Sequence, residues 1–390
     1  MRAPDVALVT PYPTAGQRHA GPSGVASYGA NLAHALAAEG VDVEVLAPHE
    51  PDAPSEPVDA YDGPVRVRRV FDRGPRGLTR AAGAAFASRA PVVHLQHELF
   101  LYGGPAAVPS AIPALVRLRR RHAAVVTMHQ VVDPGTVDRG FTELHRVRVP
   151  SRVARHALDG VQRSLAAVAS ACIVHEAPFA DTVPGSVVIP HGVEERATPT
   201  RDEARALLDL DDRLVVLCFG FLAPYKGLES VLEAGARVGS SETVVVVAGG
   251  PHPRLAAAGD PYAADLERRW DGSGTRFTGW VPEAHVAPWF AAADVAVFAY
   301  PAPFSSSGAL ALAFAHGTPV LLSPPMARCV GAPEALVAPV DPAGLAERLR
   351  SLRRPEVRAG LAAATAPLAA SRRWDAVAAA HLDLYEQLAS

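Results

Sequence analysis

The chain has 390 residues, 49% of them apolar, which is more than one hydrophobic core usually accommodates, so two domains are expected. A formal net charge of −3 argues against a general affinity for nucleic acids. No apolar stretch reaches the roughly 18 residues that span a bilayer, and a strand pattern begins close to the N-terminus. We therefore expect a cytoplasmic protein without a cleaved signal peptide.

The first half of the chain alternates short β-branched runs with helical patterns, which is typical of a parallel sheet with crossover helices. A glycine-rich turn over 19–24 follows the first strand, and apolar residues then recur at helical spacing: Val25, Tyr28, Leu32 and Leu36. Strands are predicted at Val6–Thr10, Val41–Leu46, Val65–Val70, Pro91–Leu95, Ala124–Met128, Ala171–Val174 and Val187–Ile189.

The pattern restarts after a polar stretch. Strands are predicted at Leu214–Phe219, Thr243–Ala248, Asp294–Ala299 and Pro319–Ser323, with helical patterns between them. The fold class is thus α/β, with two Rossmann-like domains facing a cleft. We place the first domain at 1–193, a linker at 194–202, the second domain at 203–365 and a C-terminal helix at 366–390. That helix has one apolar stripe, which should pack on the domain pair. The stripe consists of Trp374, Val377, His381, Leu384 and Leu388.

Three widely spaced cysteines, Cys172, Cys218 and Cys329, are odd in number. The first two lie in apolar runs, which predicts buried thiols in a reducing compartment.

Lys226 is the single lysine among 37 basic residues. A lone ammonium in an arginine-using sequence indicates a position that needs a compact point charge. It lies in the turn Phe219–Gly227, between a strand and a helix, where free backbone N–H groups and the helix dipole favour an anionic ligand. A plain turn with a surface lysine is the simpler alternative.

A second strand-to-helix turn precedes an apolar helix and is rich in serine. Ser306 and Ser307 are candidate caps, and Gly308 lets a phosphate approach the backbone beside Ala309 and Leu310. Two such turns in one domain fit a diphosphate, which needs several donors. A third segment, Phe277–Pro282, has a backbone that could meet the edge of a nucleobase.

Taken in order and spacing, these segments resemble the retaining GT-B glycosyltransferases of the glycosyltransferase group 1 family (family 4). The matching segments run nearly end to end: 21–36, 92–98, 125–129, 188–193, Gly220–Gly227, 248–251, 278–281 and 306–320.

The resemblance implies roles for individual residues. Lys226 corresponds to the diphosphate-binding lysine, and Ser307 to Leu310 correspond to the helix start that cradles phosphate. Gly24 corresponds to the loop glycine that closes over the donor, and Val281 to the residue whose backbone meets the base. His129 corresponds to the histidine that contacts the transferred sugar.

The segment Gln96, His97 and Glu98 ends a neighbouring strand and is expected on the acceptor side, with a structural role as the alternative. A zinc site from His97, Glu98 and His129 is conceivable but has no recognised spacing.

Two departures from the family pattern affect the site. Phe221 stands where the family often has arginine, a contact that Arg328 could replace. The usual pair of glutamates falls on Phe304 and Leu312, so recognition of the sugar and the ribose must differ.

The implied function is transfer of a hexose-type sugar from a nucleotide-diphosphate sugar to a glycan, glycolipid or small-metabolite acceptor. We expect no metal and no other cofactor, because the only Asp-x-Asp, Asp209 to Asp211, precedes a strand instead of following one. The alternatives are a degenerate nucleotide-sugar-binding module, or another GT-B enzyme such as an epimerase or phosphorylase.

An arginine-rich stretch between 65 and 155 leaves peripheral membrane contact open, with a solvated helix face as the simpler explanation. Four of its arginines lie close together: Arg117, Arg119, Arg120 and Arg121.

Overall fold

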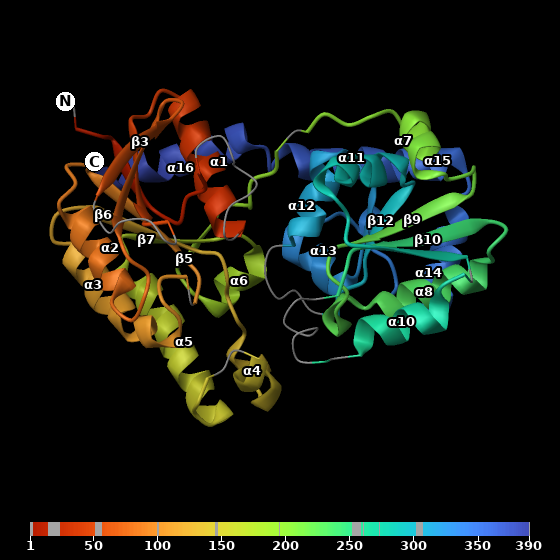
Figure 1. Cartoon of the computed structure of the whole chain (residues 1–390), viewed down its shortest axis with the longest axis horizontal. Helices are drawn as coiled ribbons and strands as arrows, with labels where there is room; N and C mark the ends of the chain where they lie inside the picture. Colours follow the sequence, from red (N-terminus) through yellow and green to blue (C-terminus); the bar gives the residue numbers. More distant parts are fainter. Residues whose placement is uncertain are drawn as a thin grey trace. The chain divides into compact units, whose positions relative to one another are not determined.

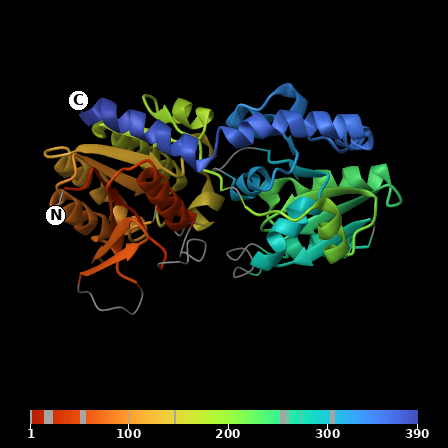
Figure 2. The same cartoon turned by 90° about the horizontal axis from the view of Figure 1, so that it is seen from above.

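The computed structural model describes residues 3–14, 24–50, 57–99, 101–144, 147–194, 196–251, 259, 261–272, 274–301 and 307–389. The chain divides into two compact units (Figures 1 and 2). Unit 1 holds the described residues of 1–192 and 374–389, and unit 2 holds those of 193–303 and 307–373.

Unit 1 is built on a sheet whose described strands run in the order β3-β4-β2-β1-β5-β6-β7-β8. The strands are β1 Val6–Val9, β2 Val43–Pro48, β3 Val58–Asp62, β4 Val65–Phe71, β5 Val92–His97, β6 Ala123–Met128, β7 Ala171–Val174 and β8 Val187–Val188. All pair in parallel except β3, which pairs antiparallel with β4 at the edge. The sequence pattern missed β3 because nearly all of that strand is exposed and carries no apolar run.

Helices cover both faces of this sheet (Figure 1). They are α1 Gly24–Ala38, α2 Gly77–Phe86, α3 Ala111–Leu118, α4 Arg139–Leu144, α5 Ser151–Val168, α6 Ala177–Thr182 and α16 Trp374–Ala389. Helices α1 and α16 pack together on one face, where Tyr28, Leu32 and Val377 join alternate strand residues in one core. Burial on both faces explains why β2, expected to alternate, is buried along its whole length.

Unit 2 contains a parallel sheet in the order β11-β10-β9-β12-β13. Its strands are β9 Leu214–Phe219, β10 Thr243–Ala248, β11 Thr275–Gly279, β12 Val295–Phe298 and β13 Val320–Leu322. Its helices are α7 Arg201–Leu208, α8 Leu228–Val238, α10 Tyr262–Trp270, α11 Glu283–Ala292, α12 Gly308–Ala315, α13 Pro324–Val330, α14 Pro342–Ser351 and α15 Pro355–Ala370. The sheet order reverses between β9 and β12, and a fold of this kind binds ligands at the carboxyl ends of the strands beside that point.

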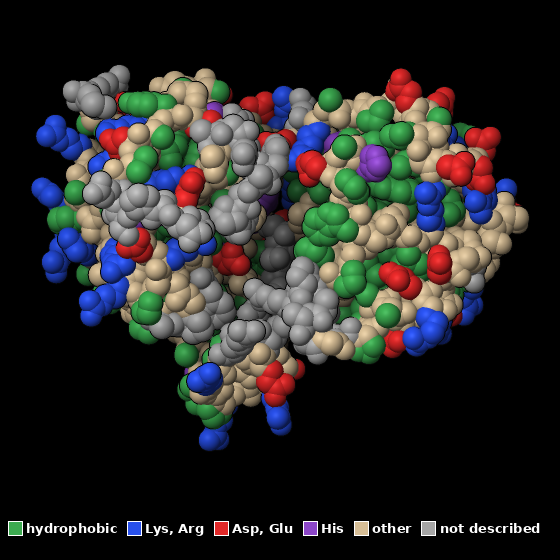
Figure 3. All heavy atoms as spheres, viewed as in Figure 1, with side chains coloured by type: hydrophobic (Ala, Val, Ile, Leu, Met, Phe, Trp, Pro, Cys, Tyr) green, Lys and Arg blue, Asp and Glu red, His purple; other side chains and the backbone are tan. Residues whose placement is uncertain are grey.

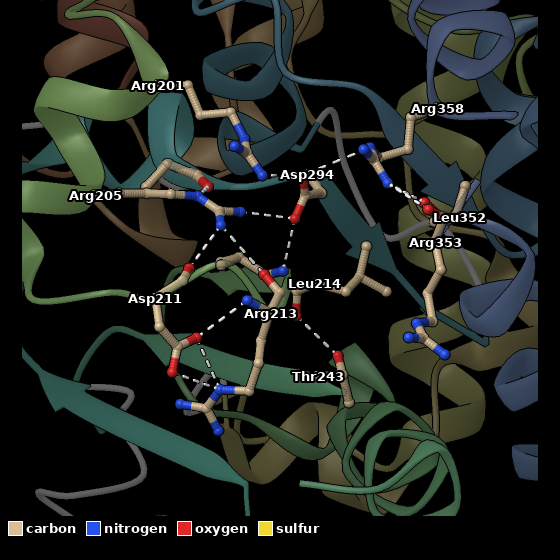
Figure 4. A network of polar contacts seen from close by, with 12 residues as sticks. Arg201, Arg205, Asp211, Arg213, Leu214, Thr243, Asp294, Leu352, Arg353 and Arg358 are labelled. Atoms are coloured by element: carbon tan, nitrogen blue, oxygen red, sulfur yellow. Dashed lines mark hydrogen bonds and ion pairs between the residues drawn. The ribbon is translucent and has the colours of Figure 1, made fainter. Parts of the chain in front are cut away.

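A buried carboxylate anchors the opposite, amino edge of this sheet (Figure 4). Asp294 precedes β12 and is 6% exposed. Its oxygens lie 2.8 Å from the guanidinium of Arg205 and 2.9 Å from that of Arg201, and it accepts a hydrogen bond from the backbone N–H of Val215 at 2.8 Å. Helix α7, which carries both arginines, is thereby fixed to β9 and β12.

The C-terminal segment differs from the single helix expected over 366–390. Helix α15 ends at Ala370, and α16 begins at Trp374 and belongs to unit 1. A β-carbon on Gly192 would lie 2.4 Å from the Trp374 ring, so only glycine lets that ring lie against the backbone there.

Candidate functional site

Lys226 lies at the carboxyl end of β9, beside the point where the sheet order of unit 2 reverses. The turn Pro224–Lys226 is a short 3-10 helix, and Gly227 follows with φ +63°, where a β-carbon would lie 2.3 Å from the carbonyl oxygen of Ala299. The side chain is therefore directed back over the sheet edge, and Lys226 is only 8% exposed.

The ammonium of Lys226 has no carboxylate partner among the described residues. Its Nζ donates a hydrogen bond to the backbone carbonyl of Phe219 at 3.1 Å and lies 6.0 Å from the centroid of the Tyr300 ring. Burial lowers the pKa of Lys226 to about 8. An anionic ligand stabilises an unpaired, partly desolvated ammonium of this kind more than it stabilises a solvated one.

The start of helix α12 lies next to this ammonium. A β-carbon placed on Gly220 would lie 2.5 Å from Nζ of Lys226 and 3.8 Å from the β-carbon of Ala309, so both groups border the same small volume. The structure thus brings together the lysine turn and the serine-rich turn that the sequence singled out separately.

Ser307 is the N-cap of α12 and accepts a hydrogen bond from the backbone N–H of Leu310 at 3.2 Å. Gly308 is exposed, with open space where a side chain would lie. The N–H groups of Gly308 and Ala309 also belong to this first turn, and the Ser307 side chain caps only the N–H of Leu310, so they favour an anion. Ser306 and Phe304 lie outside the described residues, and Leu312 lies on α12, partly buried.

The ends of β10 and β11 complete this edge of unit 2. Gly249 packs directly on the backbone of Gly220, and Gly250 approaches the backbone N–H of Trp280. Trp280 is 70% exposed, whereas Val281 is 9% exposed. Because the side chain of Val281 is buried, a ligand can contact this residue chiefly through its backbone.

In unit 1, His129 follows β6 at the carboxyl edge of the sheet, as predicted, and both of its ring nitrogens have side-chain partners. Nε2 lies 2.7 Å from Oε1 of the Gln96 amide, and Nδ1 lies 3.2 Å from Nε2 of His175. Burial lowers the pKa of His129 well below its usual value and that of His175 to about 3. Both rings are therefore neutral at pH 7.

The tautomers of this pair follow from the backbone. Nδ1 of His175 lies 3.0 Å from the carbonyl oxygen of Ile189, which can only accept. A neutral His175 thus accepts through Nε2, and the Nδ1–H of His129 donates to it. Nε2 of His129 is then left as an acceptor, so the Gln96 amide, whose Oε1 is placed against this nitrogen, has to be turned over to present its NH₂ group.

Gln96 and His97 lie inside β5, which extends two residues beyond the predicted strand. Gln96 is fully buried and also contacts His94 at 3.1 Å. His97 is 4% exposed and its Nδ1 has no hydrogen-bond partner among the described residues. Of the three residues predicted on the acceptor side, only Glu98 is partly exposed.

Tyr28 of α1 connects the histidines to the hydrophobic core. Its ring centroid lies 4.6 Å from that of His129, 5.0 Å from that of His191 and 5.1 Å from that of Trp374. Gly24, the first residue of α1, is exposed, and no described residue would lie within 4 Å of a β-carbon placed on it.

Contacts within unit 1 account for most of the arginine cluster, of which Arg117 lies on α3 and the other three directly follow this helix. The guanidinium groups of Arg117 and Arg121 lie 5.0 Å and 4.9 Å from the centroid of the Phe86 ring. Arg119 donates to the backbone carbonyl of Val168. Basic side chains also show along the edge of unit 1 at α2 and α3 in the space-filling view (Figure 3).

Cys172, Cys218 and Cys329 are buried, as predicted, and none of them forms a disulfide with another described residue. In the described part of the chain no cluster of three or more His, Cys, Asp or Glu residues could hold a metal ion, and no helix is long and apolar enough to cross a membrane. Asp209 terminates α7, and Asp211 pairs with Arg213 at 2.8 Å, which places both at the amino edge of unit 2.

Comparison with known proteins assigns the class. Residues 213–354 match a family model described as glycosyl transferases group 1, and residues 22–195 match one described as glycosyltransferase family 4. A D-inositol 3-phosphate glycosyltransferase from Streptomyces scabiei is 31% identical over 395 residues, which cover 93% of this chain and 86% of that protein.

Solved structures show the same fold. Sucrose-phosphate synthase from Thermosynechococcus elongatus superposes with a TM-score of 0.71 at 21% identity, over 99% of both chains. HepE of Anabaena in complex with UDP and glucose gives 0.65 at 15% identity, over 99% of this chain and 100% of that one. The chain therefore belongs to the group 1, family 4 glycosyltransferases and has the GT-B fold.

Proposed function

We propose that this glycosyltransferase is a retaining enzyme that moves a hexose-type sugar from a nucleotide-diphosphate sugar to a glycan, glycolipid or small-metabolite acceptor. The observation that carries the proposal is the buried, unpaired ammonium of Lys226 beside the open start of α12. Departure of the leaving group concentrates negative charge on a nucleoside diphosphate, and fixed donors aimed at that charge stabilise it.

In this proposal unit 2 binds the donor. Lys226, Ser306, Ser307 and the start of α12 from Gly308 to Leu310 bind the diphosphate, and Ser307 also caps α12. The backbone at Val281 meets the base. Because these groups supply positive charge without a bound ion, we propose that transfer needs no metal, and an assay in EDTA tests this directly.

Unit 1 is proposed to bind the acceptor and to contact the transferred sugar. His129 and Gly24 serve the sugar side, and Glu98 is the most accessible acceptor-side residue. Since Gln96 already occupies Nε2 of His129, a sugar hydroxyl that bonds to this nitrogen has to replace Gln96.

An assay of transfer tests the activity. UDP-, GDP- and ADP-glucose are offered with sugars, glycolipids and phosphorylated cyclitols, the last because a 31% identical relative is named for an inositol phosphate. We expect an α-linked product from an α-linked donor, and a β-linked product would contradict retention.

The same assay separates the alternatives. An epimerase would change the free donor without an acceptor, and a phosphorylase would require inorganic phosphate. A degenerate binding module, which the loss of the family's glutamates at Phe304 and Leu312 favours, would bind the donor without turnover. Peripheral membrane contact and a cytoplasmic location stay predictions, and co-sedimentation with anionic vesicles tests the first.

A further inference from the structure

Tyr300 is a third polar group at the point where the sheet of unit 2 reverses. It lies two residues beyond the end of β12 and is 9% exposed. Its ring lies 6.0 Å from Nζ of Lys226, and its hydroxyl lies 3.5 Å from the Oγ of Ser307. One side chain thus borders both the ammonium and the cap of α12.

The position of Tyr300 is fixed from several sides. Its backbone carbonyl accepts a hydrogen bond from the hydroxyl of Ser323, which is itself 2% exposed. Its ring makes edge contacts with Phe298 at 6.0 Å and with Tyr225 at 6.2 Å between centroids. A donor held this firmly loses little entropy when a ligand binds.

The hydroxyl of Tyr300 is a donor without a good acceptor. The 3.5 Å contact with Ser307 is longer than the 2.5 to 3.0 Å typical of such bonds, and the described residues offer nothing closer. Burial raises the pKa of Tyr300, so the proton stays on the oxygen at physiological pH. A nearby anion would be the natural acceptor.

Phe221 stands where the family often has an arginine that contacts the diphosphate. This chain therefore lacks one donor at that position. Phe221 instead packs its ring 5.9 Å from that of Trp280. Arg328, the replacement considered from the sequence, is exposed on α13 and makes no hydrogen bond or ion pair with Lys226, Tyr300 or Ser307.

We propose that the Tyr300 hydroxyl donates a hydrogen bond to the diphosphate of the nucleotide and so supplies the contact that Phe221 cannot make. The inference rests on the proposed function, because it requires the diphosphate to lie beside Lys226. It adds a binding residue that the family resemblance does not indicate.

Calorimetric titration of the full chain tests the proposal. UDP, GDP and ADP are compared on the wild type, and the tightest binder and its parent nucleoside then serve as probes. Three variants are measured: Tyr300→Phe, which loses only the hydroxyl; Tyr61→Phe, a matched control in unit 1 with a 62% exposed ring; and Lys226→Ala. Thermal unfolding of each variant is recorded.

We expect Tyr300→Phe to lower the affinity for the nucleoside diphosphate about tenfold, as for loss of a hydrogen bond to a charged group. Nucleoside affinity and thermal stability should stay at wild-type values, and Tyr61→Phe should bind both probes normally.

The failures are distinguishable. If Lys226→Ala lowers the affinity for the nucleoside diphosphate and Tyr300→Phe does not, the role proposed for Tyr300 is wrong and the proposed function stands. An equal loss of nucleoside affinity in Tyr300→Phe also overturns the inference, since the hydroxyl then shapes the pocket. If neither variant matters, or the wild type binds no diphosphate, the proposed function itself is rejected.

Discussion

Nδ1 of His129 lies 3.2 Å from Nε2 of His175, and through this contact the tautomer of His175 determines that of His129. His175 is tied by its other nitrogen to the carbonyl of Ile189, so it orients His129 much as a backbone-tied second residue orients a metal-bound histidine. His175 is thus a positioning residue for whatever His129 contacts.

His129→Ala should lower turnover by about 10- to 100-fold, the range for loss of one hydrogen bond made in the transition state. Donor affinity should change much less, because the proposed contacts with the nucleoside diphosphate part of the donor lie in unit 2. Steady-state kinetics together with direct donor titration separates the two effects. His175→Ala should lower turnover by a smaller factor, and wild-type turnover in His129→Ala would remove that residue from the site.

Buried neutral histidines should make the protein acid-sensitive. Burial lowers the pKa of His97 to about 4, whereas an unfolded histidine titrates near 6.5. The unfolded state therefore binds more protons below pH 6.5, and stability falls as the pH drops towards 4, by about 3 kcal/mol for His97 alone.

Urea unfolding between pH 7 and 4 tests this. His97→Asn should lose less stability over that range than the wild type does, while His156→Asn, which removes an exposed histidine, should behave like the wild type. Identical pH profiles for all three proteins would contradict the burial argument.

Asp294 and Asp211 offer a matched pair of ion-pair substitutions in unit 2. Asp294→Asn leaves the buried guanidinium of Arg205 without its charge partner and should cost about 3–5 kcal/mol. Asp211→Asn breaks a pair whose carboxylate is 58% exposed and should cost less than about 1 kcal/mol. Urea midpoints that fall equally in the two variants would show that burial does not govern this network.

The sequence predicted the elements that the site depends on. Strand-to-helix turns carry strong local signals, so Lys226 and the cap Ser307 could be located from glycine, serine and apolar spacing alone. The apolar stripe of α16 was also visible from the sequence. It was expected to pack on the domain pair, whereas Val377 and Leu384 of α16 belong to the core of unit 1.

Other features depend on contacts between distant residues and could not be predicted. The pairing of His129 with His175 joins residues 46 positions apart, and periodicity gives no hint of it. Gln96 and His97 are polar, which made β5 end too early in the predicted pattern. Tyr300 follows a strand as a lone aromatic residue, and only its position beside Lys226 marks it.

The affinity for a nucleoside diphosphate should depend on pH through Lys226. Its pKa of about 8 in the free protein should rise when an anion binds, because the anion stabilises the ammonium. Binding above pH 8 then takes up a proton, so affinity falls as pH rises, by up to about tenfold per pH unit. Titrations from pH 7 to 9.5 measure this, and Lys226→Ala should show a flat profile.

The account rests most directly on the affinity of Lys226→Ala for the nucleoside diphosphate that binds the wild type most tightly. Calorimetry at pH 7.5 should show a loss of at least about tenfold, with unfolding no easier than in the wild type because a buried, unpaired charge has been removed. A folded variant that binds the diphosphate as tightly as the wild type would contradict the assignment of this edge of unit 2 as the donor site.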